Sequence, residues 1–382
     1  MSGRPAAGVS KASASLLIGT DRLVTGAGHD APGWLRINDG VICESGSGAA
    51  PGPVDDSFET IVPGFVDTHV HGAGGVDFAT LGADPTIAID FHARAGSTSL
   101  VASVATGDWA GTLDRLRELA PLVTAGQIAG LHLEGPYLSY ARRGAHDPAL
   151  LREPNAAEIA AALDAAGGAL VMVTIAPELP GALNAITQFV GAGVTVAIGH
   201  TDASAEVMRR SVDAGASVVT HLFNGMPPLH HRMPGPVGVA LTDDSLVLEL
   251  IGDGHHLSDL AVDLVRQAAS GRYVLVSDAM AATGLGDGRY DLAGSDVVVV
   301  DGVAMLADAS SLAGSTTPVA GALARLLERG VPLSELVGAT STQPAHSLGL
   351  PNPSLVAGGK ADLVALTGSR VARVMKAGSW LA

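Results

Sequence analysis

Eight apolar runs follow one another through the middle of this chain of 382 residues. Each run is rich in Val, Ile, Leu and Ala and stops at a glycine, a proline or a polar residue, as buried β-strands commonly do. Segments with the 3.6-residue period of an amphipathic helix lie between most of the runs, and several of them end in glycine, a frequent helix C-cap. The eight runs span residues 60–72, 97–107, 127–136, 169–178, 194–201, 216–225, 245–256 and 272–280.

This alternation predicts the fold class. Strands that alternate with helices, and that are apolar along their whole length, indicate a parallel sheet covered by helices. Eight such units over roughly 220 residues are typical of a (β/α)8 barrel. An open, doubly wound sheet is the alternative, but no G-x-G-x-x-G follows a strand to favour a dinucleotide-binding fold. We therefore predict an α/β protein built on a (β/α)8 TIM-like barrel.

The two ends of the chain have a different pattern. Residues 15–61 contain short runs of alternating polar and apolar residues separated by turns, and residues 360–381 contain two more such runs. We predict that both chain ends form one small β-sandwich domain beside the barrel. The division is then 1–61 and 347–382 for the small domain and 62–346 for the barrel, with a β-hairpin inserted at 293–307 around an Asp-Gly turn.

Composition narrows the classes of function. Hydrophobic residues make up 47% of the chain and aromatic residues only 3%, so the core must be mainly aliphatic. The formal net charge of −16 argues against broad binding to nucleic acid or to an anionic membrane surface. No apolar stretch is long and clean enough to span a bilayer, and residues 1–14 lack the apolar core of a signal peptide. The single cysteine, Cys43, cannot form an intramolecular disulfide, which favours a reducing, cytoplasmic location.

Residues suited to metal binding stand at the ends of most of the runs. In a barrel of this kind the carboxyl ends of all eight strands open onto one face, where active sites lie. Side chains far apart in the chain would therefore meet in one pocket, and we predict a metal site there. The residues at these ends are His69, His71, Glu134, His200, His221, Asp253, His255, His256 and Asp278.

Two sets of ligands can be drawn from these residues. Glu134, His200 and His221 supply one carboxylate and two imidazoles, which leaves an open coordination position, as catalytic metal sites require. His69 and His71 point to the same face of a strand and could bind a second ion, with Glu134 as the bridge between the two.

Other chemistries find less support. A carbamylated lysine is excluded as a bridging ligand because the three lysines, Lys11, Lys360 and Lys376, all lie outside the barrel. A serine nucleophile is not favoured because the chain has no G-x-S-x-G, and Cys43 lies in the flanking β region. If Asp278 lies beside a metal-bound water, it is the natural general base and then the acid for the leaving group, although an aspartate in this place can also cap the following helix.

Six segments carry a resemblance to a known family. They are VPGFVDTHVHG, LHLEGPYLS, GHTDAS, THLFNGMPPLHHRMPG, DGHHL and VSDAMAATGL. Together they resemble the N-acetylglucosamine-6-phosphate deacetylases of the amidohydrolase superfamily, over residues 60–316 and the flanking β elements. The resemblance implies hydrolysis of the acetamide of N-acetyl-D-glucosamine 6-phosphate to D-glucosamine 6-phosphate and acetate. It also implies one or two divalent metal ions per subunit, with zinc expected and iron, cobalt, manganese or cadmium as alternatives.

The resemblance implies roles for single residues as well. Glu134, His200 and His221 match the family's tightly held metal ligands, and His69 and His71 are present as a second pair. Asp278 matches the catalytic acid/base, and His146 matches a loop histidine that polarises the acetyl carbonyl. A homodimer is implied too, in which Arg232 and His256 reach the active site of the neighbouring subunit. Substrate contacts are expected from Ala145, Asn224, Gly225, Arg232, Asp253, His256, Leu312, Ala313 and Gly314.

Two rival interpretations stay open at this point. The same fold could hydrolyse a related substrate, either N-acetylgalactosamine 6-phosphate or an N-acyl-D-amino acid. A barrel that has lost catalysis and serves only in assembly is disfavoured, because such a protein would be expected to lack ligands and here every ligand position is filled.

Overall fold

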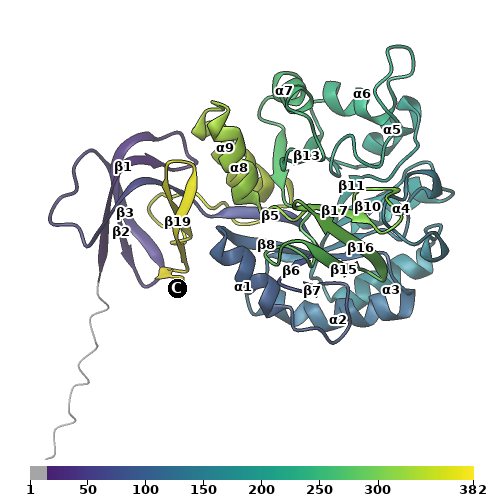
Figure 1. The fold of residues 1–382 in the computed structure, drawn as a ribbon, viewed down its shortest axis with the longest axis horizontal. Coiled ribbons are helices and arrows are strands. Elements are labelled where there is room, and N and C mark those ends of the chain that lie inside the picture. The colour runs from purple at the N-terminus through teal and green to yellow at the C-terminus, as the bar shows by residue number, and fades with distance from the viewer. Residues whose placement is uncertain (1–14) are drawn as a thin grey trace, which may run out of the picture.

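Eight parallel strands form the central sheet of the computed structural model, which describes residues 15–382. Each strand lies within one of the eight apolar runs and pairs with its neighbours in sequence order, so the predicted barrel is confirmed (Figure 1). The expectation for residues 1–14 lies outside the described residues. The barrel strands are β5 (Phe65–Val70), β8 (Ser97–Ala105), β9 (Gly130–Glu134), β10 (Leu170–Ile175), β11 (Thr195–Ile198), β12 (Val218–Val219), β13 (Val247–Ile251) and β14 (Tyr273–Val276).

The first and last strands of the barrel meet at a seam where a side chain makes one of the connections. The backbone N–H of Ser277 donates to Oδ1 of the buried Asp67 at 3.1 Å. Next to it, the N–H of Asp278 donates to the carbonyl of His69 at 2.9 Å. Burial raises the pKa of Asp67 to about 6, although the hydrogen bonds from Ser277 and His69 oppose this rise. The contacts that close the barrel therefore also place Asp278.

Helices cover the outside of the barrel, and side chains mark where several of them begin. Asp108, Asn155, Ser204 and Ser258 each accept a hydrogen bond from a backbone N–H of the first turn that follows. The helices are α1 (Thr86–Arg94), α2 (Trp109–Thr124), α3 (Ala156–Ala166), α4 (Ala182–Gly191), α5 (Ala205–Asp213), α6 (Gly235–Thr242), α7 (Asp259–Ala268) and α8 (Val319–Glu328). A short helical stretch follows, formed by α9 (Leu333–Val337), the π-helical turn η3 (Gly338–Thr342) and α10 (Gln343–Ser347).

Two details between β11 and β13 differ from the sequence pattern. The run 216–225 predicts a long strand, but only Val218–Val219 is extended, because His221 turns the chain with a φ of 26°. Helix α6 is not predicted, because it is apolar on nearly every side and therefore has no amphipathic period to detect.

Both chain ends contribute to the small domain, as predicted. Its seven strands form one hydrogen-bonded sheet in the order β20-β19-β18-β4-β1-β2-β3, which curls around a core that includes Ile18, Leu35, Ile61 and Leu363. The curl brings edge strand β3 against the segment before β18, where the N–H of Ile42 donates to the carbonyl of Gly359 at 2.9 Å. The division at 61/62 and 346/347 stays a prediction. The strands are β1 (Leu16–Val24), β2 (Asp30–Asn38), β3 (Val41–Ser47), β4 (Asp56–Pro63), β18 (Leu363–Thr367), β19 (Arg370–Lys376) and β20 (Ser379–Trp380).

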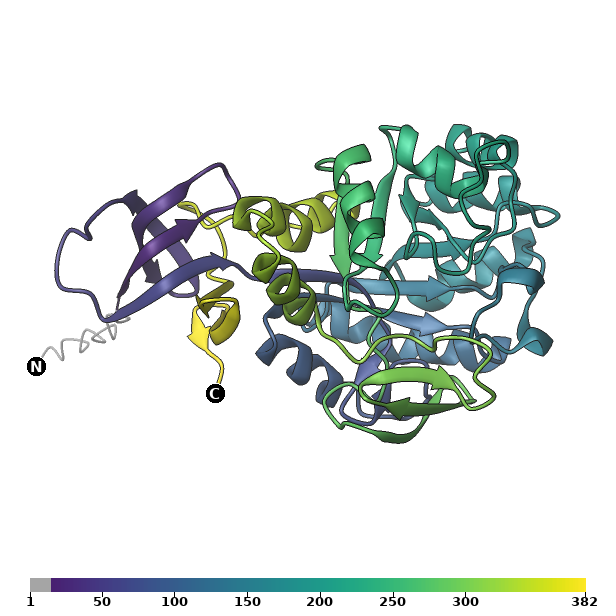
Figure 2. The ribbon, with the colours of Figure 1, turned by 45° about the horizontal axis from the view of Figure 1, so that its top comes forward.

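A three-stranded antiparallel sheet lies against the outside of the barrel (Figure 2). The hairpin predicted at 293–307 is present as β16 (Ser295–Val300) and β17 (Val303–Leu306), and β15 (Gly288–Leu292) adds a strand that the sequence does not predict. The N–H of Ala293 donates to Oδ2 of Asp77 at 3.0 Å, which fixes this sheet to the loop after β5. The remaining short elements are β6 (Gly72–Ala73), β7 (Val76–Asp77) and the 3-10 turns η1 (Tyr140–Arg142) and η2 (Pro148–Leu150).

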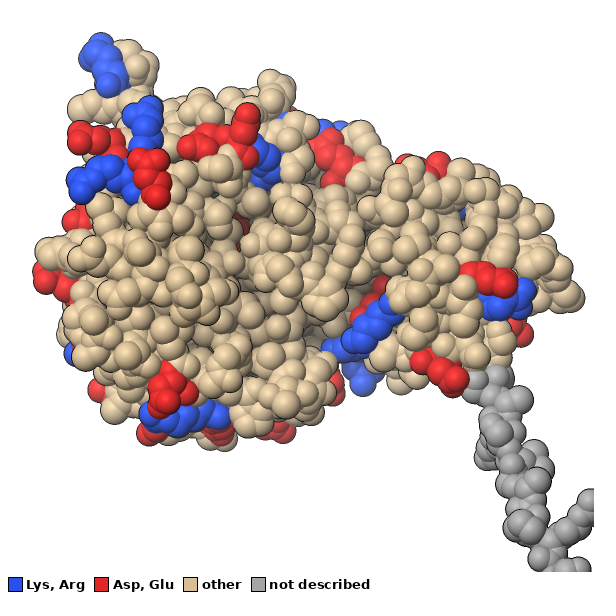
Figure 3. All heavy atoms as spheres, turned by 180° about the vertical axis from the view of Figure 1, so that it is seen from behind, with Lys and Arg blue, Asp and Glu red and all other residues tan. Residues whose placement is uncertain are grey.

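The surface gives a mixed pattern of charge. On the face drawn in Figure 3, acidic and basic side chains lie beside one another in several groups, and uncharged side chains cover most of the area between them. Among the described residues, no helix has both the length and the apolar character that crossing a bilayer requires.

Gly64 joins β4 to β5 and so connects the small domain to the barrel. A Cβ at this position would lie 2.0 Å from Oγ1 of the buried Thr98, which is far inside contact distance. We expect Gly64→Ala to lower the free energy of unfolding by about 1–3 kcal/mol, because the added methyl group overpacks a closed site.

Thermal unfolding of the purified protein measures this effect. Gly52→Ala is the matched control, since a Cβ there meets nothing within 4 Å and its backbone is not left-handed. Equal melting temperatures for the two variants would contradict the proposed overpacking.

Candidate active site

A pocket opens at the carboxyl ends of the barrel strands and is lined by most of the residues that the sequence singles out. Its lining comes from the ends of β8, β9, β13 and β15 and from the segments after β5, β8, β9, β11, β12, β13, β14, β15 and β17, so most of it lies at the carboxyl ends of the barrel strands. Its lining includes His71, Glu134, Ala145, His146, His200, His221, Asn224, Gly225, His256, Asp278, Leu312 and Gly314.

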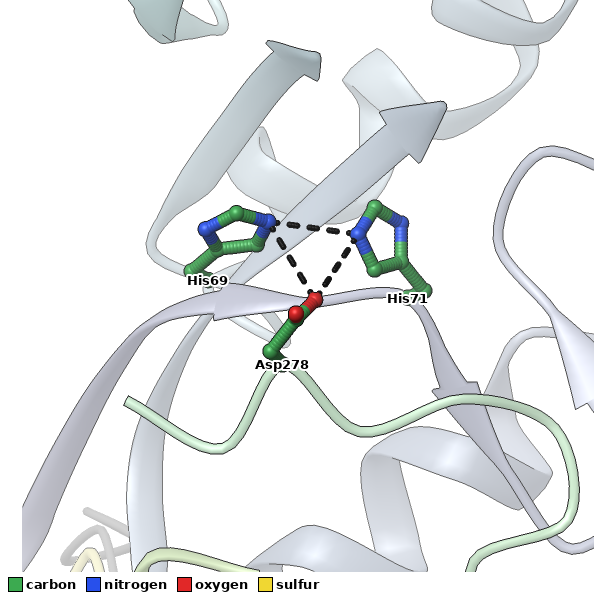
Figure 4. Close-up of side chains that lie close together, drawn as sticks. All are labelled: His69, His71 and Asp278. Carbon is green, nitrogen blue, oxygen red and sulfur yellow. Dashed lines mark hydrogen bonds and ion pairs between the residues drawn. The ribbon is translucent and has the colours of Figure 1, made fainter. Parts of the chain in front are cut away.

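One cluster in this pocket combines β5 with the loop after β14. Nε2 of His69 and Nε2 of His71 lie 3.2 Å apart. Oδ1 of Asp278 lies 3.5 Å from the first nitrogen and 3.2 Å from the second (Figure 4). These three side chains are buried and offer ligand atoms to one common point.

The second cluster is formed by Glu134, His200 and His221. Oε1 of Glu134 lies 3.3 Å from Nε2 of each histidine, and the two Nε2 atoms lie 3.0 Å apart. Glu134 also connects the two clusters, because its Oε1 lies 3.4 Å from Nε2 of His69 and its Oε2 lies 3.1 Å from Nε2 of His71.

The hydrogen bonds behind the rings set the direction of the lone pairs. Nδ1 of His69 lies 3.0 Å from a carboxylate oxygen of Glu249, and Nδ1 of His200 lies 2.9 Å from the carbonyl oxygen of Arg142. Both partners accept hydrogen bonds, so the proton belongs on Nδ1 and the lone pair of Nε2 points into the pocket. Metal-binding histidines usually have such an acceptor behind the ring, bonded to the nitrogen that does not face the metal.

The donor set fits a divalent cation. Oε1 of Glu134 is buried and makes no hydrogen bond, although three imidazole nitrogens lie within 3.4 Å of it. Ligand atoms around a tetrahedral zinc ion, at bond lengths of about 2.0–2.1 Å, are separated by about 3.3 Å, which matches these spacings. A cation bound between Oε1 of Glu134 and the imidazole nitrogens would explain why these atoms lie so close together although Oε1 makes no hydrogen bond.

Charges in the pocket favour a positive species at the same point. Burial alone would lower the pKa of His71, but hydrogen bonds and charge from Asp278 and Glu134 outweigh it and raise that pKa to about 10. Burial would raise the pKa of both carboxyl groups, but the nearby histidines hold the pKa of Glu134 and that of Asp278 well below their ordinary values. The same carboxylates therefore attract either protons on the imidazoles or a divalent cation, and binding of the cation would displace those protons.

Strained backbone conformations aim three of the candidate metal ligands. His200, His221 and Asp278 have φ angles of 46°, 26° and 47°, in the left-handed region that residues with a side chain seldom adopt. Each of them follows the end of a barrel strand, and the turn directs its side chain into the pocket. Conformations of this kind persist where surrounding structure enforces them, and they gather at functional sites.

His146 is brought to the pocket by the loop after β9. Its Nε2 lies 3.5 Å from Oε2 of Glu134, and its ring meets that of His200 edge to face. Burial lowers the pKa of His146, against the opposing influence of Glu134. A neutral imidazole here can donate one hydrogen bond to a substrate oxygen.

Four of the expected substrate contacts need comment. His256 lines the pocket of its own chain with a nearly buried side chain. This position favours a role in its own pocket, and the expected contribution to the neighbouring subunit stays a prediction. Asp253 lies outside the lining and holds Nδ1 of His256 at 2.7 Å. Ala313 is fully buried beside the pocket wall, and only its neighbours Leu312 and Gly314 line the pocket. Arg232 is exposed on the loop after β12 and does not line this pocket.

Glu249 is a buried residue near the site that the sequence analysis misses, and Thr106, Asp147 and Ser311 of the pocket lining are missed as well. Glu249 stands in the middle of the apolar strand β13 and is 1% exposed. A lone glutamate among Leu and Ile in a buried strand was the available signal, because a buried carboxylate requires polar partners. Glu249 is missed because it lies in the middle of its apolar run, whereas the candidate ligands were taken from the ends of the runs.

Comparisons with known proteins agree with this geometry. Residues 60–381 match the Amidohydrolase family. The chain is 39% identical to the N-acetylgalactosamine-6-phosphate deacetylase of Escherichia coli O157:H7, over 90% of this chain and 93% of that protein. It is 35% identical to the N-acetylglucosamine-6-phosphate deacetylase of Vibrio furnissii, over 83% of this chain and 80% of that protein. A solved mutant of the Mycobacterium smegmatis N-acetyl-D-glucosamine-6-phosphate deacetylase, in complex with N-acetyl-D-glucosamine-6-phosphate, matches with a TM-score of 0.93 at 43% identity, over 96% of this chain and 99% of that chain.

Glu134 is the one side chain that both clusters share, so its carboxylate should matter most for metal retention. We expect Glu134→Gln to weaken metal binding by at least about 100-fold, since losing a residue that only hydrogen-bonds to a metal ligand already weakens it by about 10–100-fold. Elemental analysis of the purified protein, after dialysis against graded concentrations of a chelator, measures this. Glu328→Gln is the control, because that carboxylate is bonded to Ser369 on the surface. Equal metal retention in both variants would remove Glu134 from the metal site.

Proposed function

Because this chain belongs to the amidohydrolase family, we propose that it hydrolyses the acetamide of N-acetyl-D-glucosamine 6-phosphate. The products are D-glucosamine 6-phosphate and acetate, which places the reaction in amino-sugar metabolism. The observation that carries this proposal is the likeness, at 43% identity and over nearly the whole chain, to the Mycobacterium smegmatis enzyme that binds this compound. The intact set of ligand residues supports catalysis over a purely structural role.

The metal centre is proposed to hold zinc, at Glu134, His200 and His221. The three-ligand set leaves a position open, which suits a catalytic rather than a structural site. His69, His71 and Asp278 offer a second place for an ion beside it. When bound, a divalent cation polarises the acetyl carbonyl and makes water a stronger acid.

Asp278 is proposed to move the protons of the reaction. Its low pKa keeps it ionised at neutral pH, so it can accept a proton from the attacking water. The same carboxyl group then delivers that proton to the nitrogen of the leaving sugar as the C–N bond breaks. One water is consumed, the acetyl group leaves as acetate, and the sugar keeps its amine.

His146 and the loop residues are proposed to hold the substrate. The neutral imidazole of His146 donates a hydrogen bond to the acetyl oxygen as negative charge develops there. His256, fixed by Asp253, faces the sugar together with Asn224 and the backbone at Gly225. Ala145, Leu312 and Gly314 supply the less polar part of the wall.

A second candidate substrate is N-acetylgalactosamine 6-phosphate, because the Escherichia coli relative at 39% identity is named for it. The two sugars differ only in the configuration at C4, so one pocket can accept both to different degrees. Measuring kcat/KM for both phosphorylated sugars, for unphosphorylated N-acetyl-D-glucosamine and for an N-acyl-D-amino acid tests the proposal. Highest kcat/KM on N-acetyl-D-glucosamine 6-phosphate supports it, whereas preference for the galactosamine compound would transfer the assignment to that substrate.

The proposed role of Asp278 has a direct test. We expect Asp278→Asn to retain metal at Glu134, His200 and His221 while kcat falls by about 10²–10⁴-fold, because the amide cannot accept the proton. Turnover and metal content are to be measured on the same sample. Near-normal turnover with full metal would show that another group moves the proton.

Arg232 is proposed to bind the substrate phosphate in the neighbouring subunit of a homodimer. Support comes from its exposure on the loop after β12 and from its guanidinium, whose neighbour at 2.7 Å is the adjacent His231. In such a dimer, each pocket would combine its own Asp278 with the Arg232 of the other chain.

Mixed dimers test this arrangement. We expect Arg232→Ala and Asp278→Asn each to have low activity alone, and activity to recover partly when the two are unfolded and refolded together. The mixed dimer has one pocket with an intact Asp278 and the intact Arg232 of its partner. Absence of recovery, with mixed dimers present, would place both residues in one chain's site. A protein mixture without refolding is the control.

A further inference from the structure

Glu249 is a buried carboxylate in the barrel interior that the proposed chemistry leaves without a role. It lies on β13, a strand that otherwise contributes Val, Leu and Ile to the core. A carboxylate in such a place is unfavourable unless hydrogen bonds or a positive charge compensate it.

Its contacts lead to both ligand clusters. Oε2 of Glu249 lies 3.0 Å from Nδ1 of His69 and accepts a hydrogen bond from the backbone N–H of His221 at 3.4 Å. Oε1 accepts from the hydroxyl of Thr68 at 3.4 Å. The backbone carbonyl of Glu249 also accepts from the N–H of Leu222 at 2.8 Å, directly after His221. One residue therefore touches a histidine of each cluster.

The ring of His69 contacts two other histidine rings, and Glu249 hydrogen-bonds to its Nδ1. The edge of the His132 ring lies against it, with ring centres 4.7 Å apart, and the His221 ring stacks on it at 5.6 Å. These ring contacts restrict where the imidazole lies but do not choose its tautomer. Only a hydrogen-bond acceptor at Nδ1 places the proton there and leaves the Nε2 lone pair facing Glu134 and Asp278.

The other three candidate metal-binding histidines have no carboxylate hydrogen-bonded to Nδ1. Nδ1 of His71 and Nδ1 of His221 are buried and make no hydrogen bond, and His200 is backed by a backbone carbonyl. Among these four histidines, His69 is the one with a carboxylate behind it.

We propose that Glu249 is a positioning residue, which sets the tautomer and orientation of His69 for metal binding and ties that histidine to the strand end that carries His221. The inference rests on the proposed function only in taking this metal centre as the catalytic one. Loss of a residue that hydrogen-bonds to a metal ligand weakens metal binding by about 10–100-fold. We expect an effect of that size on an ion held by His69, His71 and Asp278.

Two substitutions separate the roles of shape and charge. Glu249→Gln keeps an oxygen that can accept from Nδ1 of His69 but removes the charge. Glu249→Leu keeps a similar volume but removes the acceptor as well. We therefore expect metal retention to decrease in the order wild type, Glu249→Gln, Glu249→Leu.

The experiment measures metal per chain in the purified, zinc-loaded proteins as chelator concentration is raised. Glu249→Leu should lose the ion of the His69 cluster at a chelator concentration about 10–100-fold lower than wild type, while the ion at Glu134, His200 and His221 stays. The absorption spectrum of cobalt-loaded protein should change in the same variant, because the coordination of the cation at His69 changes. Glu335→Gln is the control, since that carboxylate pairs with Arg266 and Tyr273 away from the pocket.

The results that would overturn the proposed role of Glu249 differ from those that would refute the proposed substrate. Wild-type metal retention and an unchanged cobalt spectrum in a folded Glu249→Leu protein would overturn the proposal and leave Glu249 as a structural residue. If that variant does not fold, Glu249→Gln decides, and wild-type retention in it overturns the proposal equally. A third outcome separates the two proposals. If metal binding weakens in the Glu249 variants but the wild-type protein does not hydrolyse N-acetyl-D-glucosamine 6-phosphate, the proposed substrate is refuted and the role of Glu249 stands.

Discussion

The imidazole nitrogens of His200 and His221 point at one another beside a carboxylate oxygen that they share, and the surrounding structure has to hold them there. Nε2 of His200 and Nε2 of His221 lie 3.0 Å apart, with Oε1 of Glu134 within 3.3 Å of both. Lone pairs repel at that distance unless a positive species lies between them. Because the atoms are buried, water cannot screen them, and the pocket must hold protons or a cation.

The barrel supplies the rigidity that this arrangement needs. Glu134 ends β9, while His200 and His221 follow β11 and β12, so their separation is set by the spacing of the parallel strands, with β10 between β9 and β11. Left-handed turns at His200, His221 and Asp278 then direct side chains that an extended strand would point elsewhere. Strain of this kind is tolerated because the closed sheet and its covering helices hold the chain on both sides.

The loops over the pocket are fastened to each other as well as to the barrel. Arg142 forms an ion pair with Asp202 at 2.8 Å, which joins the loop that carries His146 to the loop after His200. The hydroxyl of Ser295 donates to the carbonyl of Ala145 at 3.1 Å, which fixes the same loop to the three-stranded sheet outside the barrel. The wall of the pocket thus includes three segments that are joined by hydrogen bonds and ion pairs, although they are far apart in the chain.

Much of this could be predicted from the sequence alone, because its signals are local. A buried parallel strand requires a continuous apolar run, so eight runs predicted eight strands, and the candidate metal ligands were visible as polar residues at the ends of these runs. The sequence could not predict α6, whose apolar residues have no helical period, or the early turn at His221, where one φ angle ends the strand. Only the tertiary structure decided that His256 faces its own pocket, that Asp67 closes the barrel beside Asp278, and that Glu249 stands behind His69. These are contacts between residues up to 210 positions apart, and their distances depend on how the closed sheet brings strands together rather than on any pattern along the chain.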